Sequence, residues 1–244
     1  MMRRTMSRKC GQFLSSKFHR GAFWRDRNSW PAHPRPRISF KHRPKTVRES
    51  LALWGLLTYM SIRELWQKRV QDEELFKLEF LIPGRSEKRT VLLSPEVNRL
   101  VSPPWPDTEM GIRCAQLRAE MEDILAGERL VVSWAPAGKA RDYHQIARLE
   151  PLEDNIFDIR SVEPPPALRV LFHFAEKDVL VTHLCSPRSV PVYWLDRVPL
   201  LDRRSKAWRK AIAESNANWS VLFPHYSPHS GTQIDDFLSN AVLG

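Results

Sequence analysis

The chain has 244 residues, of which 42% are hydrophobic, enough for one sizeable core with extensions. Its formal net charge of +10 is typical of a nucleic-acid-binding protein, but residues 1–48 alone hold 14 Lys and Arg against a single acidic residue. The rest of the chain carries 24 of the 38 basic and 27 of the 28 acidic side chains. The overall charge of the chain is therefore no evidence that this larger part binds nucleic acid.

Cysteine usage and hydropathy exclude two further classes. Cys10, Cys114 and Cys185 are far apart and show no zinc-ligand spacing, so we expect neither a disulfide framework nor a metal site. The apolar run LALWGLL at 51–57 is far shorter than the ~20 residues that span a bilayer. It also begins too late for a secretory signal. We therefore expect a cytoplasmic protein with no membrane partner and no cofactor.

Residues 1–59 are rich in Arg, as transit peptides are, but stretches such as WPAHPRPR at 30–37 break any helical periodicity. Three interpretations stay open: a disordered basic arm, a targeting segment, or translation from an upstream start with Met60 as the true one. We expect a disordered basic arm, which can bind phosphate groups through charge alone.

Ordered structure is expected from Ser61. The sequence SIRE at 61–64 is a capping box that begins a helix. Next, FKLEFLI at 76–82 alternates between apolar and polar residues, as a strand does. The turn residues PGRSEK then lead to RTVLL at 89–93, which predicts a hairpin.

Two helices follow. Ser94 is a good N-cap for SPEVNRLV, with Pro95 at the first helical position. A longer helix is predicted from about Thr108 to Ala126, with Gly127 where a C-terminal cap belongs. Its apolar residues form one stripe, which we assign to the core: Met110, Cys114, Leu117, Met121 and Ile124.

Beyond Gly127 the hydrophobic period becomes that of strands. Five candidates follow one another: RLVVSWA, YHQIARL, NIFDIRS, ALRVLFHF and DVLVTHL. Their short connections favour an antiparallel meander. A helix is predicted over about 203–215, and the residues from Asn216 are expected to be irregular, apart from a short amphipathic helix in TQIDDFLSNAVL.

The predicted fold class is therefore α+β, with an antiparallel β-meander packed against two N-terminal helices and a C-terminal helix. The predicted domain covers residues 60–215, with its core at 89–215, between the arm at 1–59 and a C-terminal tail at 216–244. Four side chains are expected in the core: Leu117, Ile156, Val170 and Leu180.

Three of the predicted strands carry a recurring pattern. After Leu149 and an acidic turn, Phe-Asp-Ile precedes Arg160, Arg169 precedes Val-Leu-Phe, and an aliphatic strand ends in His183. This pattern, over about residues 149–191, resembles the core signature of the RelE/HigB superfamily of toxin ribonucleases. The chain departs from that signature after the histidine, where Leu-Cys replaces Gly-Phe and a single Arg replaces paired lysines.

The resemblance implies a RelE-like fold and an endoribonuclease of a type II toxin–antitoxin system that needs no metal. In that chemistry Arg160 and Arg169 would stabilise the phosphate charge, and His183 would transfer a proton. Three further basic residues are candidates for substrate binding: Lys139, Arg141 and Arg188. The implied partners are RNA, including RNA on the ribosome, and a small antitoxin protein.

Structural roles are the alternative for the same residues. Arg160 and Arg169 can pair with Asp158 or Glu163, and His183 can be a buried structural histidine. Three functions therefore stay open: a toxin ribonuclease; a RelE-fold protein without activity, as a binding module or an inactive relic; and a basic-tailed nucleic-acid-binding protein with an unrelated domain.

Overall fold

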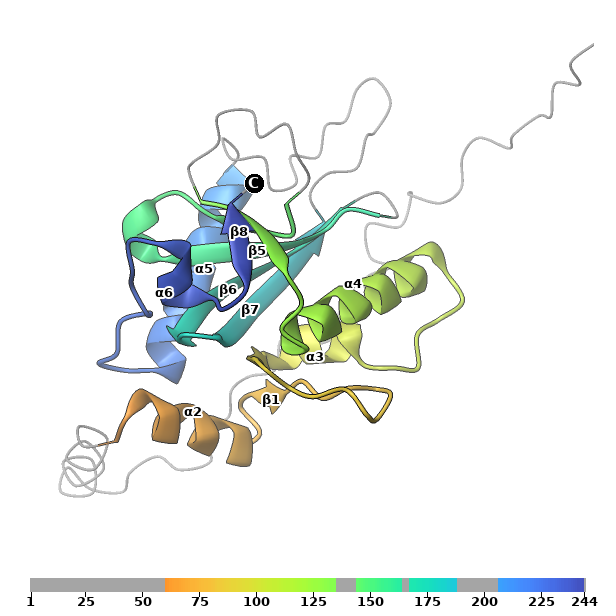
Figure 1. The fold of residues 1–244 in the computed structure, drawn as a ribbon, viewed down its shortest axis with the longest axis horizontal. Coiled ribbons are helices and arrows are strands. Elements are labelled where there is room, and N and C mark those ends of the chain that lie inside the picture. The colour runs from red at the N-terminus through yellow and green to blue at the C-terminus, as the bar shows by residue number, and fades with distance from the viewer. Residues whose placement is uncertain (1–59, 135–143, 164–166, 188–205, 244) are drawn as a thin grey trace, which may run out of the picture. The chain divides into compact units, whose positions relative to one another are not determined.

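The structure, a computed structural model, describes residues 60–134, 144–163, 167–187 and 206–243 (Figure 1). The chain divides into two units, 1–50 and 51–244, and all described residues belong to the second. The predicted arm at 1–59 therefore lies outside the described residues.

The described residues form both helices and strands, which join one sheet and its covering layers. The helices are α2 (Ile62–Gln71), α3 (Pro95–Val101), α4 (Glu109–Leu125), the 3-10 turn η1 (Leu152–Asp154), α5 (Lys206–Leu222) and α6 (Ile234–Phe237). The strands are β1 (Phe76–Lys77), β2 (Thr90–Leu93), β3 (Leu130–Ser133), β4 (Ile146–Arg148), β5 (Ile156–Ser161), β6 (Leu168–Glu176), β7 (Val179–Pro187) and β8 (Ala241–Leu243).

All eight strands join one mixed sheet in the order β1-β2-β7-β6-β5-β4-β3-β8. The predicted meander is confirmed for β4, β5, β6 and β7, which pair antiparallel with one another in sequence order. The prediction is wrong for the first of the five strands, because β3 pairs with β4 in parallel. The connection between them is about a dozen residues long, which is enough for the crossover that parallel pairing requires.

The helix starts follow the predicted capping chemistry. Ser61 forms a complete capping box at α2, Ser94 accepts from the Val97 amide at α3, and Thr108 accepts from the Gly111 amide at α4. The predicted hairpin is also present, because β1 pairs antiparallel with β2, although β1 is only two residues long.

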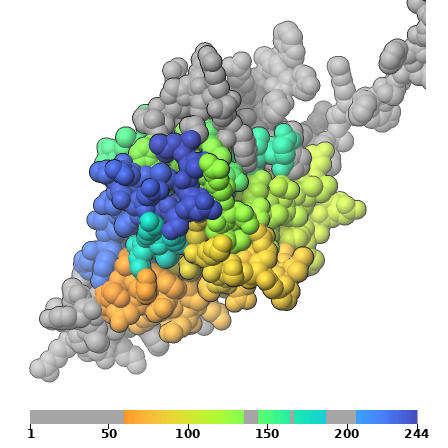
Figure 2. Space-filling view, in the orientation of Figure 1, coloured from red at the N-terminus to blue at the C-terminus, as the bar shows by residue number. Residues whose placement is uncertain are grey.

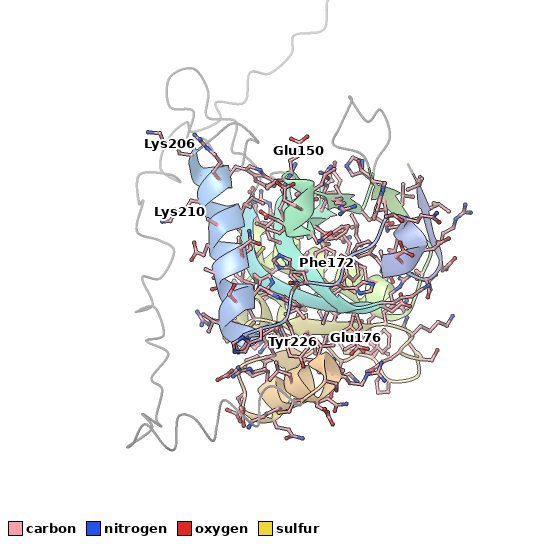
Figure 3. The ribbon with its side chains drawn as sticks, turned by 90° about the vertical axis from the view of Figure 1, so that its left-hand side faces the viewer. Glu150, Phe172, Glu176, Lys206, Lys210 and Tyr226 are labelled. Atoms are coloured by element: carbon pink, nitrogen blue, oxygen red, sulfur yellow. The ribbon has the colours of Figure 1, made fainter. Side chains whose placement is uncertain are left out.

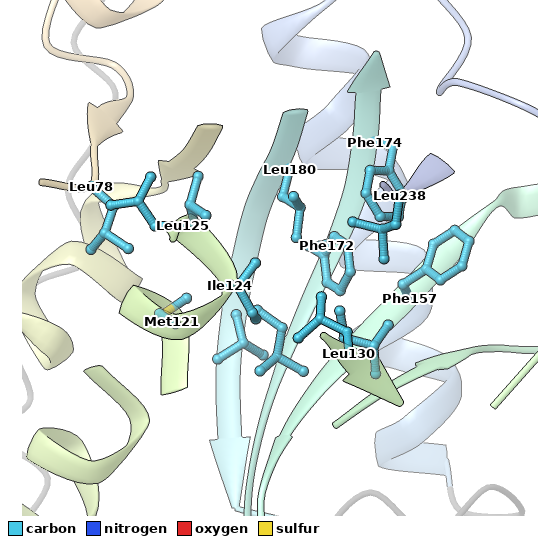
Figure 4. Close-up of a cluster of buried hydrophobic side chains, with 14 of the residues drawn as sticks. Leu78, Met121, Ile124, Leu125, Leu130, Phe157, Phe172, Phe174, Leu180 and Leu238 are labelled. Carbon is cyan, nitrogen blue, oxygen red and sulfur yellow. The ribbon is translucent and has the colours of Figure 1, made fainter. Parts of the chain in front are cut away.

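The sheet is covered on both faces. On one face the side chains of β5, β6 and β7 pack with α3, α4 and α6 in the largest hydrophobic cluster, shown in part in Figure 4. Among the labelled members of that cluster are Met121, Leu125, Phe157, Phe172 and Leu180. On the other face the alternate side chains of the same strands pack with α5 and α2. Since strand side chains alternate between faces, β6 contributes Phe172 to the first face and Leu171 to the second.

The C-terminal region is more ordered than its sequence suggested. Helix α5 was predicted to end near residue 215 but continues to Leu222, because Trp219 extends its apolar stripe against the sheet. The tail predicted at 216–244 therefore begins within α5. The short helix α6 was predicted, but the residues after it form β8, which pairs in parallel with β3. Figure 2 shows these C-terminal residues in blue against the green of β3.

The four predicted core residues are all buried, with exposed fractions of 0 to 1%. Leu180 belongs to the largest cluster, so Leu180→Ala is expected to lower the free energy of unfolding by about 2–5 kcal/mol through lost contacts and a cavity. The control is Val221→Ala on α5, because Val221 is half exposed and its truncation should change stability by less than about 0.5 kcal/mol. Urea melts of both variants measure this, and equal losses would contradict the assigned burial.

Candidate functional site

The two predicted catalytic arginines lie side by side and share one carboxylate. Strands β5 and β6 pair so that Arg160 is directly opposite Arg169. Arg160 Nε donates to Asp158 Oδ1 at 2.9 Å, and Arg169 Nη1 donates to Asp158 Oδ2 at 2.7 Å. Asp158 is 0% exposed and Arg169 only 4%. The result is a buried group of two guanidinium ions bridged by one carboxylate, which we call the Arg–Asp–Arg group.

This group lies on the face of the sheet that α5 covers. Asp158 and Arg160 are two residues apart on β5, so their side chains leave the strand on the same face. The guanidinium carbon of Arg169 lies 5.4 Å from the centroid of the Trp208 ring on α5, in a cation–π contact. Arg160 Nη1 also contacts Nε2 of His144. The indole and the carboxylate together replace water around the Arg169 cation.

A second polar group is buried on the same face, further along the strands. Nε2 of His183 lies 2.7 Å from Nδ1 of His173, which stands on β6 beside β7. Nε2 of His173 lies 3.2 Å from Asn216 Oδ1, and Asn216 Nδ2 donates to Asp154 Oδ2 at 2.9 Å. These contacts form a chain of four side chains, the histidine chain, that runs from the buried β7 strand to the partly exposed Asp154 in η1.

The carboxylate of Asp154, at the end of the histidine chain, indicates which ring nitrogens of His173 and His183 carry a proton. Asp154 accepts a hydrogen bond from the amide nitrogen of Asn216, so the amide oxygen faces His173 and accepts a hydrogen bond from its Nε2–H. In the neutral ring the Nδ1 of His173 is then an acceptor, so the Nε2–H of His183 donates to it. The Nδ1 of His183 carries a lone pair, and it has no hydrogen-bond partner in the part of the chain that the structure describes.

Burial keeps both imidazoles neutral. Desolvation lowers the pKa of His173 to about 4, although Asn216 and the Asp154 backbone favour its protonation. Desolvation also lowers the pKa of His183 well below 6.5, and the neighbouring His173 adds to this shift. Both rings are therefore uncharged at neutral pH, which is compatible with their positions under α5.

A β-bulge places His183 in this chain. Leu171 is opposite Leu184 whereas Phe172 is opposite Thr182, so β7 contains one residue more than β6 at this point. Leu184 packs with α5, and His183 contacts Trp219 of the same helix. The bulge therefore turns two consecutive side chains toward α5.

The three predicted catalytic residues thus share one face of the sheet. Arg160 and Arg169 lie together, whereas His183 is bonded to His173 and is 2% exposed. In this conformation Arg169 and His183 are closed to solvent by α5, and their catalytic roles stay predictions. The three predicted substrate-binding residues are outside the described residues: Lys139, Arg141 and Arg188.

Sequence reasoning missed most of the histidine chain. His173 follows Arg169 at even spacing on β6, so the period of two that places Arg169 on the α5 face also places His173 there. That signal was present in the sequence. Asn216 was missed because α5 was predicted to end before it, and its partner Asp154 lies in the turn η1.

A cavity of about 370 Å³ lies where η1 faces α5. Asp154 and Asn216, the outer end of the histidine chain, are part of its wall. Figure 3 shows Glu150, another wall residue, near the end of the sheet that faces the start of α5. The wall is completed by apolar and charged side chains: Pro151, Trp208, Arg209, Ile212 and Ala213. Its size is within the ~300–1,000 Å³ of typical small-ligand sites.

The described residues contain neither a metal-binding cluster nor a membrane-spanning helix. No group of three or more His, Cys, Asp or Glu side chains could hold a metal ion in the described ranges. None of the helices found there is long and apolar enough to cross a membrane. Family models, curated proteins and solved structures gave no match to this chain.

Proposed function

We propose that this protein is a cytoplasmic binding module with a RelE/HigB-like fold that does not cut RNA through Arg160, Arg169 and His183. The observation that carries this proposal is the Arg–Asp–Arg group. Both guanidinium ions already bind the same buried carboxylate, Asp158, at hydrogen-bonding distance. That carboxylate stands where a phosphate would have to bind.

A phosphate clamp needs guanidinium N–H groups that are open to the substrate. To bind RNA here, a phosphate would have to displace Asp158 from both arginines and leave that carboxylate buried without a partner, which is costly. His183 presents a related obstacle, because a side chain that is 2% exposed cannot reach the leaving oxygen of a bound RNA. The geometry therefore favours a structural role for this face of the sheet.

Two features support the RelE-like part of the proposal. The described chain runs from β2 through two helices and the parallel strand β3 to the antiparallel strands β4 to β7 and the helix α5, which supports the order that the sequence resemblance implies. In addition, the residues that carry the resemblance form the centre of the sheet, in β5, β6 and β7.

The second candidate is the endoribonuclease toxin itself, with RNA as substrate and a small antitoxin as partner. It is favoured by the position of Arg160, Arg169 and His183 on one face of one sheet. For this function α5 would have to leave that face, since it covers Arg169 with Trp208. The two candidates therefore differ in what expression of the protein should do.

The test is expression of the full chain in a bacterial host, with growth and RNA integrity as readouts. We expect no growth arrest and no new RNA ends, either from the natural chain or from Arg169→Ala. The control for general effects of losing an arginine is Arg129→Ala, because Arg129 is exposed. Arrest by the natural chain and by Arg129→Ala, but not by Arg169→Ala, would replace the first proposal with the second.

A further inference from the structure

The cavity between η1 and α5 combines charges of both signs with an apolar wall. Glu150 and Asp154 supply carboxylates from the η1 side, and Arg209 supplies a guanidinium from α5. Trp208 and Ile212 are buried residues of the same helix that also line the cavity. A ligand that matched this wall would carry a positive group, a negative group and an apolar body.

The charged side chains of the cavity are available to a ligand. Within the ranges that the structure describes, neither Glu150 nor Arg209 forms an ion pair. Asp154 uses Oδ2 to accept from Asn216 and is only partly buried. The carboxylates outnumber the guanidinium in the wall, so the cavity favours a cation over an anion.

We propose that this cavity binds a small organic ammonium compound with an apolar body, and that α-amino acids with aliphatic side chains fit it best. The ammonium group binds at Asp154 and Glu150, and a carboxylate on the same ligand binds Arg209. The aliphatic body packs on Trp208 and Ile212. This inference rests on the proposed binding function and supplies the chemical class of its ligand.

The histidine chain gives the site a built-in reporter. Asp154 is both a wall residue of the cavity and the acceptor for Asn216 Nδ2. An ammonium group at Asp154 competes for that carboxylate and changes the hydrogen bond of Asn216. Because Asn216 Oδ1 contacts His173 Nε2, the imidazole resonances of His173 are expected to shift on binding. Binding of a ligand elsewhere on the surface would not move them.

The experiment uses three matched probes on the full chain. L-leucine carries both charges, 3-methylbutylamine is the same body with the ammonium group alone, and 4-methylpentanoate has the carboxylate alone. Isothermal titration calorimetry and the His173 resonances are the readouts. We expect saturable binding of L-leucine and binding of 3-methylbutylamine that is about tenfold weaker, since each charged contact is worth roughly a tenfold change in affinity. Binding of 4-methylpentanoate should be about a hundredfold weaker than that of L-leucine, because it loses the contacts with both carboxylates.

Two variants assign the contacts. Asp154→Asn keeps an acceptor for Asn216 but removes the charge, so it should weaken both ammonium probes by about tenfold. Arg209→Gln should weaken L-leucine by a similar factor and leave 3-methylbutylamine unchanged. The matched control is Lys210→Gln, because Lys210 is the next residue on α5 and points away from the sheet in Figure 3. This control should bind L-leucine as the natural chain does.

Three results would overturn the inference: no saturable binding of L-leucine at tens of millimolar, equal binding of 4-methylpentanoate, or binding that neither Asp154→Asn nor Arg209→Gln weakens. None of them bears on the RNA experiment. A chain that cuts RNA and binds L-leucine would overturn the proposed function and leave the site in place. A chain that does neither would overturn the site alone.

Discussion

Replacing Asp158 with alanine is expected to lower the free energy of unfolding by about 3–5 kcal/mol, because the substitution leaves Arg169 buried without its counter-charge. The side chain of Arg169 is 4% exposed, so water cannot replace the lost carboxylate. Arg160 loses the same partner but lies nearer to solvent, and its contribution should be smaller. Chemical denaturation of the natural and variant chains measures the difference.

A second variant separates charge burial from packing. Replacing Asp158 with leucine and Arg169 with methionine together removes the two most buried charges of the group and leaves Arg160, which lies nearer to solvent. This double variant should recover most of the stability that Asp158→Ala loses. Glu153→Ala is the control for loss of a carboxylate, because Glu153 is exposed in η1 and its removal should be nearly neutral. If Asp158→Ala were as stable as Glu153→Ala, the Arg–Asp–Arg group would not be closed to solvent.

The second large effect concerns acid. The unfolded chain protonates a histidine with a pKa near 6.5, whereas burial lowers the pKa of folded His173 to about 4. The unfolded state therefore binds the proton more tightly, so the stability that neutral His173 contributes is complete above pH 6.5 and is lost as the pH falls toward 4. The loss should reach roughly 3 kcal/mol for this one residue at the acid end of the window. The pKa of His183 is lowered too, so it adds to the loss.

The comparison that isolates the histidines is a double variant, with phenylalanine in place of His173 and leucine in place of His183. Its stability should depend less on pH between 6.5 and 4 than that of the natural chain, because the carboxylates that also titrate there are common to both. Denaturant melts at a series of pH values give the two slopes. Parallel slopes would mean that the imidazoles are protonated in the folded state and that α5 does not seal them.

The helix starts and the central strands could be predicted from the sequence, because they depend on residues that are close together in the chain. The caps at Ser61, Ser94 and Thr108 each depend on residues within three positions, and all three helices begin where those residues indicate. The meander of β5, β6 and β7 was also foreseeable, since alternating side chains and short connections specify it. The resemblance drew attention to the strands on which Arg160, Arg169 and His183 stand.

What the sequence could not show depends on distant contacts. Strand β3 pairs in parallel with both β4 and β8. The alternation of apolar residues identifies each segment as a strand but does not indicate which strand it pairs with. The bulge at His183 shifts the alternation by one, so a strict period of two would place Leu184 on the wrong face. The pairing of both arginines with Asp158 was one of the alternatives that the sequence left open, whereas the cover of Arg169 by Trp208 comes from the distant helix α5 and could not be predicted.

The parallel pairing of β2 with β7 has a consequence for the route by which the chain folds. Thr90 lies beside Val179, nearly ninety positions further along the chain, with α3, α4 and most of the sheet between them. Closing so long a loop costs more conformational entropy than forming the neighbouring hairpin of β6 and β7, whose ends meet across a two-residue turn. Contacts of such wide sequence separation slow the search for the native state. We therefore expect β2 to join the sheet only after β6 and β7, which come later in the sequence, have paired.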